Sequence, residues 1–236
     1  MIEFGHATHR GLQRPRNEDT YYADPASGVF LVADGLGSHH HGALAAALAR
    51  DSIVASMEAG MAPEDAVREA DRVLIGHPEH SAHGHPMGTT VALLHLTTQG
   101  FEAAWVGDSR IYRLDTSGMK QLSHDHSRVQ EQVDRGELDA AQARRDPRRH
   151  VVTQALGVTA PADLRIGIHK GPLQASTSFL LCSDGLTEEI EDARIAAHLQ
   201  RHDIAAQECV DHLLLEALDA GGRDNITAVL VRILRA

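Results

Sequence analysis

The chain has 236 residues, of which 42% are hydrophobic, so it can bury a sizeable core, and we expect one domain over residues 1–236. A formal net charge of −11, without a basic stripe carrying interleaved aromatic residues, excludes nucleic acid as the expected partner. No stretch approaches the roughly 20 apolar residues of a membrane span, and the N-terminus lacks a signal-peptide pattern, so we expect an unexported, cytoplasmic protein without membrane contact.

The first half of the chain predicts a buried strand followed by two helices. Residues 28–35 (GVFLVADG) form a short, β-branched apolar run that ends in a turn signal, which is typical of a buried strand. Residues 43–59 are rich in Ala and Leu and predict a long helix. A second helix is expected over residues 63–75, with Pro63 in its first turn.

The middle of the chain predicts a strand meander and then a surface flap. Between residues 89 and 122 three apolar runs are separated by turn signals, and consecutive strands of this kind are expected to pair antiparallel. Residues 123–157 are polar and rich in Arg, with two short helical patterns interrupted at Gly136 and Pro147. We interpret this segment as the flap.

The last third predicts a further buried strand over residues 177–185, helices over 192–200 and 205–218, and a closing strand over 226–234. Strands and helices are grouped along the chain instead of alternating strictly, which argues against a doubly wound parallel sheet. We therefore expect the α+β class: an αββα sandwich of two antiparallel sheets covered by helices.

Four acidic residues share one context, because each lies at an end of an apolar strand beside a small or turn-forming residue. They are Asp34, Asp108, Asp184 and Asp224. One such acid alone is explained as readily by a turn or a helix cap. Four of them converging at one rim would repel each other without cations, and carboxylate oxygens favour Mg²⁺ or Mn²⁺ over Zn²⁺.

Eight short motifs along the chain resemble, in order, those of the protein phosphatase 2C family in its compact bacterial form. They are GLQRPRNED (11–19), VADGLGS (32–38), MGTT (87–90), WVGDSRIY (105–112), DHS (125–127), ALG (155–157), CSDGL (182–186) and GGRDNITAVLV (221–231). Each string alone is weak, whereas eight in order cover almost the whole chain.

The resemblance implies a metal centre. Asp34 matches the carboxylate that bridges two ions and is counted as catalytic, the carbonyl of Gly35 matches a ligand of the second ion, and Asp184 and Asp224 match further ligands of the first. Asp184 is also counted as catalytic.

Four more residues take roles from the resemblance. Asp19 and Glu18 match acids that hold the site directly or through metal-bound water, and Asp108 matches the acid that binds a third, weaker ion together with Asp184. Arg14 matches the guanidinium that holds the substrate phosphate, a task for which its rigid fork is suited.

The expected activity is hydrolysis of phosphoserine and phosphothreonine in proteins by direct attack of a water bridged by two Mn²⁺ or Mg²⁺ ions, with a possible third ion. By resemblance, the partners are phosphoproteins and a cognate bacterial serine/threonine kinase, and the protein is a monomer. The alternative is an inactive, phosphoprotein-binding pseudophosphatase, against which the intact Asp34, Asp184 and Asp224 argue.

Two features depart from the family pattern. Leu36 stands where many animal members carry a histidine that is thought to protonate the leaving group, so that role is unassigned; His39 is near in sequence, but His39–His41 are more simply a polar loop. Ser38 breaks the usual glycine pair of this loop without touching the ligand set.

Three clusters invite other readings that we rank lower. His77, His80, His83 and His85 resemble a zinc or nickel site, but Pro78, Gly84 and Pro86 indicate an irregular loop with no completing ligand. The arginines of the flap, at 144, 145, 148 and 149, are mainly a solvated surface with a modest part in recognition.

The two cysteines, Cys182 and Cys209, lie in apolar stretches without metal-ligand spacing and are expected to be reduced. A cysteine-dependent phosphatase would need an arginine six positions further on, where this chain has Glu188 and Leu215, so both cysteines are interpreted as core residues.

Overall fold

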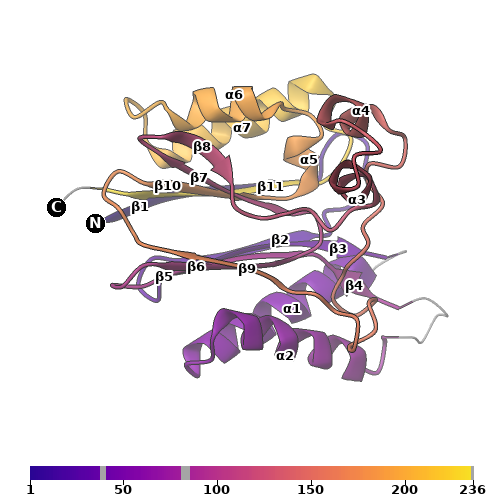
Figure 1. Cartoon of the computed structure of the whole chain (residues 1–236). Helices are drawn as coiled ribbons and strands as arrows, with labels where there is room; N and C mark the ends of the chain where they lie inside the picture. Colours follow the sequence, from indigo (N-terminus) through magenta and orange to yellow (C-terminus); the bar gives the residue numbers. More distant parts are fainter. Residues whose placement is uncertain (38–40, 81–85, 235–236) are drawn as a thin grey trace.

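The computed structural model describes residues 1–37, 41–80 and 86–234. Two antiparallel sheets lie face to face, and helices cover the outer face of each (Figure 1). Helices α1 (His41–Glu58) and α2 (Pro63–Gly76) cover one sheet, and α6 (Asp192–Leu199) and α7 (Ala206–Ala220) cover the other. This is the αββα sandwich of the α+β class that the sequence predicts.

The first sheet has the order β2-β3-β5-β6-β9, and β4 pairs with β3 beyond this path. Its strands are β2 (Asp19–Asp24), β3 (Val29–Leu36), β4 (Gly88–Thr89), β5 (Val91–Leu96), β6 (Phe101–Val106) and β9 (Gly167–Gly171). Central strand β3 is buried along most of its length, in keeping with its continuous apolar run.

The second sheet has the order β1-β11-β10-β7-β8. Its strands are β1 (Ile2–His9), β11 (Ile226–Ile233), β10 (Ser178–Cys182), β7 (Arg110–Asp115) and β8 (Gly118–Gln121). The first and last strands of the chain are therefore neighbours, with Ile2 opposite Ile233 and His9 opposite Ile226.

Three apolar clusters hold the layers together. Between the sheets, Phe30, Phe101 and Phe179 pack with aliphatic side chains, and the rings of Phe101 and Phe179 lie 4.9 Å apart. Under α1, the fully buried Ala45 and Ala49 allow the helix to approach the first sheet closely. The third cluster joins α6 and α7 to the second sheet.

The expected meander is correct for β5 and β6, which pair antiparallel, but wrong for the third strand. After Val106 the chain turns at Gly107 and crosses to the other sheet, where β7 pairs with β8 and β10. Because both β6 and β7 face the same interior, an apolar pattern alone cannot tell one sheet from the other.

The flap carries the two short helices that the sequence predicts, α3 (Arg128–Asp134) and α4 (Ala140–Arg145). Ser127 caps α3 by accepting a hydrogen bond from the backbone of Gln130, and Asp139 and Gln142 form a reciprocal capping box on α4. The flap lies at the same end of the sandwich as α5 (Asp184–Thr187) (Figure 1).

Both cysteines are buried and unpaired, as expected of core residues. Within residues 1–37, 41–80 and 86–234, no helix combines the length and apolar character of a membrane span.

Candidate active site

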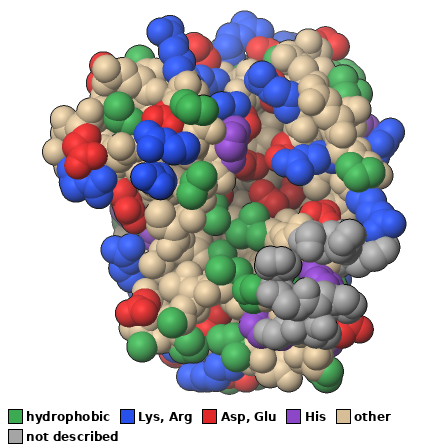
Figure 2. Space-filling model, turned by 90° about the vertical axis from the view of Figure 1, so that its right-hand side faces the viewer, with side chains coloured by type: hydrophobic (Ala, Val, Ile, Leu, Met, Phe, Trp, Pro, Cys, Tyr) green, Lys and Arg blue, Asp and Glu red, His purple; other side chains and the backbone are tan. Residues whose placement is uncertain are grey.

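Acidic side chains from both sheets meet at the flap end of the sandwich. Figure 2 shows Asp and Glu side chains on the floor of a hollow there, with Lys and Arg side chains around its upper rim. The predicted acids reach this end from separate elements: Asp34 from β3, Asp108 after β6, Asp184 at the start of α5, and Asp224 just before β11.

Asp34 and Asp19 are neighbours across the β2–β3 ladder. The Asp34 backbone is fixed by β4 and its neighbour, because its carbonyl accepts from the Thr90 amide at 2.8 Å and from the Thr89 hydroxyl at 2.8 Å. The rigid backbone at Asp34 therefore holds its carboxylate at the rim.

Asp19 links the two sheets through Ser183, the residue that precedes α5. The Ser183 hydroxyl donates to Asp19 Oδ2 at 2.8 Å and accepts from the Thr227 amide at 2.9 Å. Asp19 Oδ1 is buried and has no hydrogen-bond partner. A buried carboxylate oxygen without a partner is costly, so this atom calls for a cation or water.

Asp184 occupies the first residue of α5 and not the end of β10, which stops at Cys182. Gly185 makes this close turn possible, because a Cβ atom there would lie 2.0 Å from the carbonyl oxygen of Asn225. The segment that carries Asp184 thus packs directly against the segment that carries Asp224.

Asn225 ties the N-terminal loop to this segment. Its side-chain amide donates to the carbonyls of Arg10 (2.9 Å) and Arg16 (2.8 Å), and its Oδ1 accepts from the Glu18 amide (2.7 Å). These three bonds place Arg14 and Glu18 beside Asp224.

Arg14 lies at the exposed side of the site. Its Nη2 donates to Asp224 Oδ2 at 2.6 Å, and its side chain is 56% exposed. The hydrogen bond with Asp224 raises the pKa of Arg14, and the charges of Asp224, Asp184 and Asp34 add to this effect. A guanidinium that is permanently charged and open to solvent is suited to bind a phosphate.

Glu18 and the Gly35 carbonyl face the space above Gly42, in the first turn of α1. A Cβ atom on Gly42 would lie 2.7 Å from the Gly35 oxygen and 2.8 Å from Glu18 Oε2. The missing side chain therefore keeps open a small cradle between two oxygen donors. Burial raises the pKa of Glu18.

The carboxylates oppose one another's ionisation. Burial and then the charges of Asp19, Asp184, Asp108 and Asp224 raise the pKa of Asp34 well above its usual range. Burial raises the pKa of Asp184 in the same way, with Asp108 as the next cause.

The other two buried acids follow the same rule. Burial raises the pKa of Asp19 to about 6, although Thr227 and Ser183 oppose it through hydrogen bonds. Burial, and then the charge of Asp125, raises the pKa of Asp108 to about 7. Bound cations would remove this repulsion and leave all four acids ionised at neutral pH.

The residues fit hard divalent cations. All donors are oxygens, one of them is a buried atom without a partner, and a glycine leaves open a cradle for two more. Among the described residues, no group of three or more His, Cys, Asp or Glu side chains is placed so that these side chains alone could hold a metal ion.

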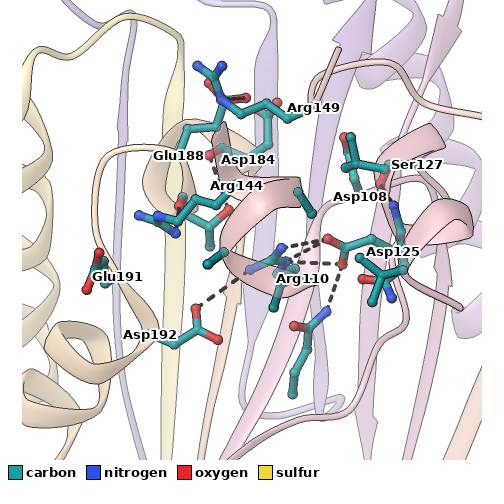
Figure 3. Close-up of a pocket in the computed structure, with 18 of the residues that line it drawn as sticks. Asp108, Arg110, Asp125, Ser127, Arg144, Arg149, Asp184, Glu188, Glu191 and Asp192 are labelled. Atoms are coloured by element: carbon teal, nitrogen blue, oxygen red, sulfur yellow. Dashed lines mark hydrogen bonds and ion pairs between the residues drawn. The ribbon is translucent and has the colours of Figure 1, made fainter. Parts of the chain in front are cut away.

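A cavity of about 490 Å³ opens from Asp108 and Asp184 toward the flap. Figure 3 shows Arg110 pointing at the adjacent Asp125, and both residues line this cavity. Arg110 donates to both Asp125 oxygens at 2.7–3.1 Å and to the Tyr112 hydroxyl at 2.9 Å. This buried pair fixes the wall of the cavity beside Asp108.

The flap contacts the segment around α5 through basic side chains. Arg144 donates to the Thr187 carbonyl at 3.0 Å, and Glu188 accepts from His150 at 2.8 Å and lies 3.6 Å from Arg149 Nε. Two of the flap arginines, Arg144 and Arg149, therefore contact the segment around α5. The sequence pattern predicts mainly a solvated surface for them. Arg148 instead pairs with Asp146 inside the flap.

The histidine clusters give a mixed result. His77 and His80 lie in irregular structure, as expected, while His83, His85, His39 and His40 lie outside the described residues. His41 belongs to α1 and is buried, so the expected polar loop does not extend to it. Leu36 ends β3.

Two residues that build the site belong to the quoted motifs, but the sequence alone does not assign them a role. Ser183 binds Asp19, 164 positions away, and Asn225 binds the carbonyl of Arg10, 215 positions away. The nearest available clue is their place beside Asp184 and Asp224.

Three comparisons relate the chain to known proteins. The family model described as Protein phosphatase 2C matches residues 7–219. A Listeria innocua protein named serine/threonine phosphatase stp is 30% identical over 237 residues, covering 95% of this chain and 93% of the relative.

Two solved structures are also similar. The catalytic domain of the serine threonine protein phosphatase PstP, solved in complex with two manganese ions, superposes with a TM-score of 0.86 at 26% identity, covering 99% of both chains. PppA, a regulatory component of T6SS in Pseudomonas aeruginosa, superposes with a TM-score of 0.82 at 31% identity, covering 98% of this chain and 97% of PppA.

Proposed function

The chain belongs to the protein phosphatase 2C family, and from that premise we propose that it is a metal-dependent protein serine/threonine phosphatase. The observation that carries this function is the convergence of buried carboxylates whose pKa values are raised by burial and mutual repulsion, with one Asp19 oxygen left unpartnered. Bound divalent cations would favour the ionised form of such a group.

The residues take the following roles in this proposal. Asp34, the Gly35 carbonyl, Asp184 and Asp224 would hold two Mn²⁺ or Mg²⁺ ions, with Asp34 serving both. Asp19 and Glu18 would complete the ligand shell directly or through water. Asp108 and Asp184 would hold a third ion. The support is the shared rim, the Asp19 oxygen and the Gly42 cradle.

Arg14 orients the substrate phosphate. Its hydrogen bond to Asp224 uses one edge of the guanidinium, so the remaining donors are available to two phosphoryl oxygens. When bound, the ions supply Lewis-acid stabilisation of the phosphoryl group and activate the attacking water. The anchoring of the loop by Asn225 keeps Arg14 in register with Asp224.

The physiological setting follows from the same family. We propose phosphorylated proteins as substrates, a cognate serine/threonine kinase as the opposing enzyme, and a monomer in the cytoplasm. Free, buried cysteines are compatible with a reducing compartment. Light scattering of the purified protein tests the monomer, and a kinase co-expression screen tests the partner.

The decisive experiment is phosphate release from a phosphothreonine peptide, comparing Mn²⁺ with EDTA and the wild type with Asp184→Asn. We expect hydrolysis that requires Mn²⁺ and is lost in the variant. A folded, Mn²⁺-loaded wild type without activity that still binds the phosphopeptide would instead support the pseudophosphatase.

A further inference from the structure

An ion pair with three hydrogen bonds lies beside the candidate metal site, although neither of its residues is a predicted metal ligand. Glu189 is the second residue after α5, and its side chain is only 1% exposed. Arg223 Nε and Nη2 donate to its two oxygens at 3.0 and 2.8 Å, and the Arg223 backbone amide donates to Oε1 at 2.9 Å. The carboxylate thus receives three hydrogen bonds from one residue.

The pair joins the two segments that carry Asp184 and Asp224. Glu189 is five residues from Asp184, and Arg223 is the direct neighbour of Asp224. Gly221, at φ +145°, passes close to the Glu189 carboxylate: a Cβ atom at position 221 would lie in ordinary contact, 3.4 Å from Oε2. A second side-chain hydrogen bond, from the Thr227 amide to the Ser183 hydroxyl at 2.9 Å, links the same two segments on the strand side of the aspartates.

We propose that the Glu189–Arg223 pair is a positioning device that sets the separation of Asp184 and Asp224 and thereby the affinity of the site for its divalent cations. The inference rests on the proposed function, because it takes both aspartates as ligands. Mutation of residues that orient metal ligands without binding the metal typically lowers metal affinity about 10- to 100-fold.

The positive charge of Arg223 makes the direction of the change in Mn²⁺ affinity informative. A cation next to the site repels Mn²⁺, so removing it would strengthen metal binding if electrostatics alone mattered. Removing the fork also takes away two of the three hydrogen bonds between Arg223 and Glu189, which weakens binding if position matters. Arg223→Gln therefore separates the two effects by direction.

The test is calorimetric titration of the metal-free proteins with MnCl2, together with the Mn²⁺ dependence of phosphopeptide hydrolysis. We expect Arg223→Gln to raise the Kd for Mn²⁺ about 10-fold or more while kcat at saturating Mn²⁺ changes less than about 3-fold. Glu189→Gln, which keeps the acceptor oxygen for the Arg223 amide, should raise the Kd in the same direction.

A matched control is Arg194→Gln. Arg194 makes the same two-pronged contact with Glu216, at 2.9 Å for each bond, but between α6 and α7 and away from the acids. Its Kd for Mn²⁺ should equal that of the wild type.

An unchanged or lower Kd in Arg223→Gln overturns the proposal. If that variant does not fold, Arg223→Lys decides, because it keeps the charge without the fork; a raised Kd supports positioning and a wild-type Kd refutes it. A wild type that lacks Mn²⁺-dependent hydrolysis would instead refute the proposed function, so the two failures are distinguishable.

Discussion

Replacing Asp108 with Asn should stabilise the metal-free protein, and increasingly so as the pH rises. Asp108 is 7% exposed, and burial, followed by the charge of Asp125, raises its pKa from 3.8 to about 7. Because the folded protein binds this proton more tightly than the unfolded chain, ionising Asp108 lowers stability. The penalty is absent below pH 3.8, grows as the pH rises toward 7, and is complete above 7.

The size of the stability difference follows from the thermodynamic linkage between proton binding and folding. Asn carries no charge at any pH, so the variant avoids a penalty of about 2 kcal/mol at pH 5.5 and about 4 kcal/mol at pH 8. These are upper values, since partial hydration of the ionised site reduces them. The difference between the two pH values, about 2 kcal/mol, is the firmer quantity.

The assay is urea unfolding in EDTA at both pH values, followed by circular dichroism. The control is Asp51→Asn, an exposed carboxylate on α1 whose removal should change the free energy of unfolding by less than about 0.5 kcal/mol. The reasoning is refuted if Asp108→Asn is no more stable than the wild type at pH 8, or if its advantage does not grow between pH 5.5 and 8.

Three further changes probe other parts of the site. Arg14→Ala removes the phosphate-binding fork and should lower kcat/KM for a phosphothreonine peptide by about 10- to 100-fold with little change in melting temperature; p-nitrophenyl phosphate presents the same phosphoryl oxygens, so an unchanged kcat/KM for both substrates would contradict this. Asn225→Ala breaks three hydrogen bonds and should lower the free energy of unfolding by about 2–4 kcal/mol, measured by denaturant titration. Gly185→Ala places a methyl group against the Asn225 carbonyl and should lower the free energy of unfolding by about 1–3 kcal/mol and weaken Mn²⁺ binding. A melting temperature and a Kd for Mn²⁺ equal to those of the wild type, both measured by calorimetry, would contradict this.

The sequence predicts the layers of helices and sheets in this fold, but it does not predict how all the strands are connected. Apolar runs and Ala-rich stretches predict β3, α1 and α2 to within a few residues, because burial dictates their composition. The crossing between β6 and β7 was not predictable, since strands of either sheet present the same alternation to one shared interior. Asp184 likewise starts a helix because Gly185 packs against a residue 40 positions later.

The candidate site is also predictable only in part. The motifs around Asp34, Asp184 and Asp224 identify candidate ligands, because acids at strand ends beside glycine are visible in the chain. Their supporting partners are not visible. Ser183, Asn225 and Glu189 take their roles from contacts made only after the sheets have assembled, and no local pattern distinguishes Glu189 from its neighbour Glu188.

The pairing of β1 with β11 has a consequence for how the protein is made. β11 lies between β1 and β10, so the eight residues Ile226–Ile233 join β1 to the body of the second sheet. Contacts of such long sequence separation slow folding, because the whole loop must close before they form. A nascent chain that lacks β11 has neither a partner for β1 nor a place for Asn225 to anchor the N-terminal loop. The candidate site can therefore assemble only after β11 has been synthesised and has paired with β1 and β10.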